Sequence, residues 1–87
     1  MRMFHLGGEM LPRASIVGIF DLDTATVSRH TREFLRRAQE GGAVVSTGED
    51  LPQSFLVTSV FGDEAAEKVY LSPQSSANLA KKLLTTP

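Results

Sequence analysis

The absence of cysteine from so short a chain is the feature that most constrains its fold. The 87 residues contain no cysteine, so neither disulfides nor thiolate-bound metals can support the core. A chain of this length also falls below the size at which proteins divide into separate cores. We therefore expect a single domain over residues 1–87, in a reducing compartment or with self-association as additional support.

Composition and charge place the chain among ordinary globular proteins. Hydrophobic residues make up 41% and charged residues 22%, and the formal net charge is −1. Nucleic-acid binding would therefore need a local basic patch, because the overall field gives no attraction. The start of the chain carries no long apolar run, and no stretch approaches the ~20 apolar residues of a membrane span. We expect a cytoplasmic protein without a signal peptide or a membrane partner.

Hydrophobic periodicity and turn residues predict an α+β fold, with a small, largely antiparallel sheet of four to five strands and two α-helices. Two helices are expected, at 28–40 and at 73–84, the second with Ser72 as N-cap and with Leu84 among its inward side chains. An acidic connection is expected over 62–67. The expected strands cover residues 2–6, 16–22, 43–47, 54–61 and 68–72, with 9–11 as an optional return strand.

The segment 16–22 reads Ile-Val-Gly-Ile-Phe-Asp-Leu and is typical of a central strand that is buried on both faces. Two short helices can cover only about one face of such a sheet. An apolar face would then stay exposed, which is unfavourable in a monomer. The pattern thus favours a homo-oligomer.

Arginines form the main charge concentration, on the helix expected over 28–40. Arg29, Arg32 and Arg36 share one column at helical spacing, and Arg37 flanks it. Guanidinium groups bind phosphates in a bidentate manner, so this column could follow a nucleic-acid backbone. The alternative is a solvated helix face on which Glu33 pairs locally with the arginines.

Candidate catalytic groups lack partners in the sequence. Asp21 and Asp23 project to one side of a strand end, but no third metal ligand is evident and the segment suits a turn. His5 and His30 have no recognisable serine or aspartate partner. The glycine pairs match no nucleotide-binding motif. We therefore expect no enzyme activity, no metal, no cofactor and no small-molecule substrate.

Six segments in order carry a resemblance to a known family. The chain resembles the extracellular matrix regulator RemA/RemB family of small bacterial proteins, and its RemB branch in particular. The resemblance extends from about residue 3 to about residue 83. The matching segments are His5-Leu6-Gly7-Gly8, Ile16–Thr24, Thr31–Leu35, Gln53–Thr58, Val69–Pro73 and Ser75-Ser76.

The resemblance implies a non-enzymatic regulator of biofilm matrix gene expression. The RemA branch looks like a DNA-binding transcriptional activator that assembles into rings. RemA-like chains carry an arginine pair after the post-helix strand, whereas this chain has Glu49-Asp50, which would repel phosphate. Contact with double-stranded DNA is therefore expected from the arginine helix, joined by Arg13. An oligomeric scaffold without nucleic-acid binding is the alternative.

Overall fold

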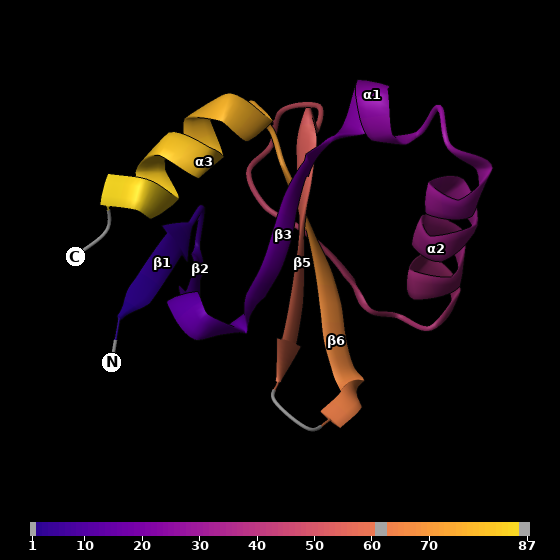
Figure 1. Ribbon diagram of the computed structural model, residues 1–87, viewed down its shortest axis with the longest axis horizontal. Coiled ribbons are helices and arrows are strands. Elements are labelled where there is room, and N and C mark those ends of the chain that lie inside the picture. Colours follow the sequence, from indigo (N-terminus) through magenta and orange to yellow (C-terminus); the bar gives the residue numbers. More distant parts are fainter. Residues whose placement is uncertain (1, 61–62, 86–87) are drawn as a thin grey trace.

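The computed structural model describes residues 2–60 and 63–85, and it confirms the α+β class (Figure 1). The two main helices are α2 (Arg29–Glu40) and α3 (Ser76–Thr85). Short helical turns form η1 (Arg13–Ser15) and α1 (Leu22–Ala25). The strands are β1 (Met3–Leu6), β2 (Glu9–Pro12), β3 (Ile16–Asp21), β4 (Val44–Ser46), β5 (Ser54–Val60) and β6 (Asp63–Ser72).

The strands form a four-stranded sheet and a separate hairpin. The sheet has the order β3-β5-β6-β4, and β1 pairs with β2 in the hairpin. Strand β5 is antiparallel to both β3 and β6, whereas β4 runs parallel to β6. The two central strands are therefore β5 and β6, and both β3 and β4 have an open edge.

The hairpin and α3 cover one face of the sheet. Phe4 and Leu6 of β1 are fully buried against Leu56 of β5 and Leu79 of α3. The Lys82 ammonium of α3 donates a hydrogen bond to the His5 carbonyl of β1, and it lies 5.2 Å from the Phe4 ring centroid. These contacts hold the end of α3 over the hairpin.

Helix α2 covers the other face. Its side chains Phe34, Leu35 and Ala38 pack against a core that contains Phe55 and Val69. The Ser28 Oγ accepts a hydrogen bond from the Thr31 N–H at 3.5 Å, and Gly41 follows the last helical residue. The predicted helix, its cap and its apolar side are confirmed.

Strand β3 differs from the prediction for 16–22. It lies at an edge, none of its residues is buried, and Leu22 already belongs to α1. Strand β5 takes the central place because it pairs with both β3 and β6. Helix α2 on one face and the hairpin with α3 on the other cover the sheet, while Val17 and Phe20 of β3 remain exposed.

Two other predicted boundaries are wrong. Strand β6 begins at Asp63, inside the segment expected as an acidic connection, and Asp63 pairs with Val60 of β5 after a register shift; Gly62 lies outside the described residues. Ser72 ends β6 and is buried, and the Ser75 Oγ accepts a hydrogen bond from Asn78 N–H at 3.1 Å as α3 begins. Leu84 is exposed.

Within residues 2–60 and 63–85, no helix has the length and apolarity needed to cross a membrane.

Candidate functional site

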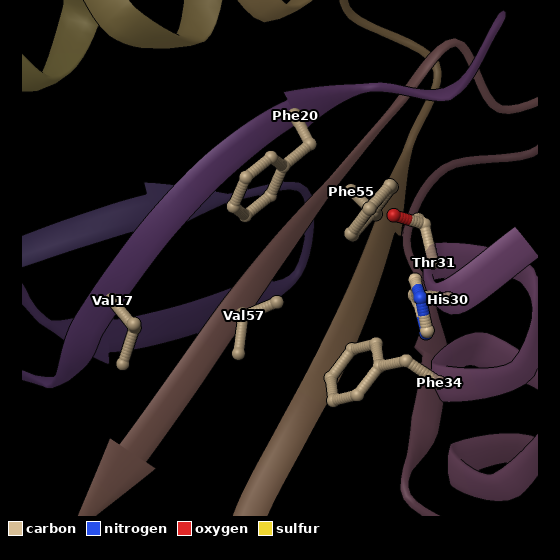
Figure 2. A pocket seen from close by; sticks show the side chains of 7 residues that line it. All are labelled: Val17, Phe20, His30, Thr31, Phe34, Phe55 and Val57. Atoms are coloured by element: carbon tan, nitrogen blue, oxygen red, sulfur yellow. The ribbon is translucent and has the colours of Figure 1, made fainter. Parts of the chain in front are cut away.

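An apolar hollow of about 300 Å³ lies between β3 and α2 (Figure 2). Strand β5 forms its floor, β3 forms one wall, and the first two turns of α2 form the other. The hollow therefore marks the part of this sheet face that α2 leaves uncovered. Its lining residues are Val17, Phe20, His30, Thr31, Phe34, Phe55 and Val57.

An irregularity in β3 shapes the hollow. The register with β5 shifts between Ile16 and Gly18, and Val17 lies at this shift. A Cβ on Gly18 would lie 2.7 Å from the Phe20 ring, so the ring can lie back along the strand only because Gly18 has no side chain. The ring also stacks on Phe55, with centroids 5.1 Å apart and planes at 22°.

The β3 wall of the hollow is open to solvent. Val17 is 68% exposed and Phe20 is 42% exposed. Both lie on an edge strand with unpaired backbone groups, which is a combination that favours association with another chain. The hollow therefore presents apolar side chains to solvent in the single chain.

The arginines of α2 are exposed but have local partners. Arg29 pairs with Glu33 at 3.2 Å, and Arg37 approaches the same carboxylate at 3.8 Å. Arg36 pairs with Glu40 at 2.9 Å. With four arginines and two glutamates, the helix keeps a formal charge of +2.

Arg32 has a different role from the other three arginines. Its guanidinium donates to the carbonyls of Thr26 and Val27, at 2.7 and 2.9 Å. These bonds fix the turn between α1 and α2. The predicted column is therefore present on the helix, but Arg32 acts within it as a structural residue.

Arg13 does not lie beside the helix arginines. It belongs to η1, which Figure 1 shows on the hairpin side of the molecule, away from α2. Its backbone N–H donates to the carbonyl of Arg2 at 2.9 Å. Together with Pro12 and Ala14, these two arginines line a second hollow of about 550 Å³. The predicted candidates therefore occupy two separate surfaces.

An acidic loop joins β4 to β5. Glu49 and Asp50 are exposed there and, among the described residues, form no ion pair. Leu51 follows them and is 88% exposed, more than any other large apolar side chain in the described part of the chain. Sequence reasoning identified the two charges but missed this leucine, since an isolated apolar residue in a loop carries no periodic signal.

The remaining candidates do not converge on a site. The Asp21 carboxylate accepts a hydrogen bond from Thr24 N–H at 2.9 Å and caps α1. His5 is exposed on β1, whereas His30 lines the hollow. No group of three or more histidine, aspartate or glutamate side chains able to hold a metal occurs among the residues that the structure describes.

Comparison with protein-family models finds no match, and comparison with curated proteins finds none either.

Proposed function

We propose that this chain is a non-enzymatic, self-associating bacterial regulator of the RemA/RemB type, which acts on extracellular matrix gene expression in the cytoplasm. In its assembled form, which could be a ring, helix α2 would contact double-stranded DNA. The ordered segments of the resemblance support the family and the process. The apolar hollow and the exposed basic helix beside it support the association and DNA parts of the proposal.

The observation that carries the proposal is the hollow at β3. Its floor, at Phe55 and Val57, is nearly inaccessible, while its β3 wall is open. Burial of such apolar area contributes roughly 25 cal/mol per Å². A second protein surface would cover it without any change in the core. Self-association is thus the simplest function that this geometry supports.

Helix α2 supports the DNA part of the proposal. Arg36 and Arg37 extend into solvent beyond the hollow, with side chains 61% and 72% exposed. Exposed pairs with glutamate contribute only about 0.2–1 kcal/mol, so phosphates can replace the glutamates. Assembly would repeat this basic surface, and repeated arginines could follow a phosphate backbone.

An oligomeric scaffold without nucleic-acid binding is the second candidate. The local pairing of Arg29, Arg36 and Arg37 with glutamates favours it, because this leaves little free positive charge per chain. The acidic Glu49-Asp50 loop favours it as well.

Fluorescence anisotropy with duplex DNA distinguishes the two candidates. We expect binding by the wild type at about 50 mM salt and a strong loss by about 200 mM salt. Arg36→Ala/Arg37→Ala should weaken binding by about tenfold or more. Lys68→Ala/Lys81→Ala removes the same charge from β6 and α3 and should bind like the wild type. Absence of binding at low salt, or equal binding by the arginine variant, would exclude the DNA role for α2.

A further inference from the structure

We propose that the hollow between β3 and α2 receives Leu51 from the acidic loop of a second copy of this chain. The contact is head-to-tail: each copy offers its loop to one neighbour and its hollow to another. This inference rests on the self-association proposed above and specifies its interface. It is built on the shape of the hollow, the charges beside it and the anchoring of the loop.

The hollow and Leu51 are complementary in size and polarity. The hollow measures about 300 Å³, which accommodates a branched aliphatic side chain. Val17 and Phe20 provide an apolar wall, and Phe34 provides another from α2. Leu51 is 88% exposed, so in the single chain it lies outside the hollow and is available to a neighbour.

The charges beside the two partners are opposite. Glu49 and Asp50 precede Leu51, whereas Arg29 precedes the hollow-lining residues His30 and Thr31 on α2. Glu33 is shared by two arginines, Arg29 and Arg37, so one guanidinium there lacks a full carboxylate partner. A loop that places Leu51 in the hollow would bring its carboxylates to this excess of positive charge.

Other exposed apolar side chains do not fit this surface. Leu84 follows Lys81 and Lys82, and Val27 lies close to Arg29 in the chain. Both would bring like charge to the arginines of α2. Met10 has only one neighbouring carboxylate, from Glu9. Leu51 alone among the exposed large apolar side chains described has two acidic neighbours.

The loop is held in place before any contact forms. At its start, the Thr47 N–H and hydroxyl both donate to the Leu71 carbonyl, at 2.9 and 2.8 Å. At its end, the Gln53 N–H donates to the Ser72 carbonyl at 2.8 Å, and the Gln53 carbonyl accepts from Leu22 N–H at 3.0 Å. Little conformational entropy would therefore be lost when the loop binds.

A head-to-tail contact makes a prediction that a symmetric one does not. Because the loop and the hollow are different surfaces, copies can add in sequence to form a closed ring or an open chain. Pairing of two β3 edges, in contrast, would use the same surface on both partners and would leave the loop free. Variants that damage one surface each can separate these arrangements.

The experiment uses two variants that are monomeric on their own but complement each other. Leu51→Asp damages the loop and keeps the hollow, while Val17→Asp damages the hollow and keeps the loop. Light scattering should give a monomer mass for each variant alone and a 1:1 dimer for the mixture. The matched control Leu84→Asp changes a similarly exposed leucine on α3 and should keep the wild-type mass. Circular dichroism establishes that each variant is folded.

Three outcomes would overturn the inference. If wild-type mass persists in Leu51→Asp, the loop is not the occupant, and a β3–β3 contact or another partner surface is indicated. If the two variants fail to form a dimer when mixed, the contact is not head-to-tail. A monomeric wild type would overturn the proposed self-association itself, which distinguishes that failure from the other two.

Discussion

Gly48 determines how the acidic loop leaves β4. Its φ is +75°, and a Cβ at this position would lie 2.9 Å from the Cγ of Pro73. A side chain would therefore meet both an unfavourable backbone conformation and a rigid ring. Gly48→Ala should lower the free energy of unfolding by about 1–2 kcal/mol, as measured by urea denaturation.

Gly8→Ala is the matched control for Gly48→Ala. Gly8 has ordinary backbone geometry, and a Cβ added there would have no atom within 4 Å. We expect its unfolding midpoint to stay close to that of the wild type. Equal effects of the two substitutions would show that Gly48 does not hold the loop in this conformation.

Tyr70 gives the protein a specific response to high pH. Burial, and to a smaller extent the Glu9 carboxylate, raises the pKa of the Tyr70 phenol above its ordinary value of about 10. The folded state therefore retains this proton more strongly than the unfolded state does. The resulting stability is fully present below pH of about 10 and is lost as pH rises through the higher folded pKa.

Comparison with Tyr70→Phe isolates this effect. The wild type should lose stability more steeply than Tyr70→Phe as pH rises above about 10, as measured by denaturant unfolding. Tyr70 is the single tyrosine of the chain and there is no tryptophan, so phenolate absorbance reports its ionisation directly. Parallel pH profiles for the two proteins would contradict the raised pKa.

At the scale of elements, Arg32 links the helices α1 and α2. It donates hydrogen bonds to two carbonyls in the turn between them, whereas Arg36 forms only a surface pair with Glu40. Arg32→Ala should reduce the free energy of unfolding by about 1 kcal/mol. Arg36→Ala should change it by less than about 0.5 kcal/mol.

Thermal unfolding of the two variants tests this difference. A clear decrease in melting temperature for Arg32→Ala alone would support the linking role. If both variants have the melting temperature of the wild type, the guanidinium of Arg32 contributes no more to folding stability than a surface ion pair does.

Elements with a local signal could be predicted from sequence, as α2 illustrates. Its N-cap Ser28, its apolar side and the Gly41 that follows it can all be identified within one short stretch of sequence. Strand β3 could not be placed, because its apolar run is the same for an edge or a central strand. Its place depends on pairing with β5, which lies far along the chain. Ser72 and Ser75 are both suitable N-cap residues for α3. Ser75 takes this role because Ser72 is the last residue of strand β6.

The candidate site was only partly accessible to sequence reasoning. The arginines of α2 were identified, but their partners and the separate position of Arg13 depend on the fold. The hollow joins Val17, Phe34 and Phe55 from three elements, and no local pattern connects them. The register shift between Ile16 and Gly18, beside the hollow, has no signature beyond the glycine itself.

At the scale of the whole molecule, the proposed self-association would bring exposed apolar side chains and opposite charges together. Although the net charge of the chain is −1, helix α2 beside the hollow carries a formal charge of +2, and the loop with Glu49 and Asp50 is acidic. Because this attraction is between exposed charges, salt should screen it. The apolar contact should persist, so assembly is expected to weaken with salt without being abolished.

The mass of the wild-type chain in solution tests the central claim most directly. Light scattering at micromolar concentration should give a mass of at least two chains, where one chain has a mass of 9.5 kDa. Val17→Asp, which places a charge in the wall of the hollow, should return the mass to that of one chain. A wild-type mass of a single chain, or an assembly unaffected by Val17→Asp, would contradict association through the hollow.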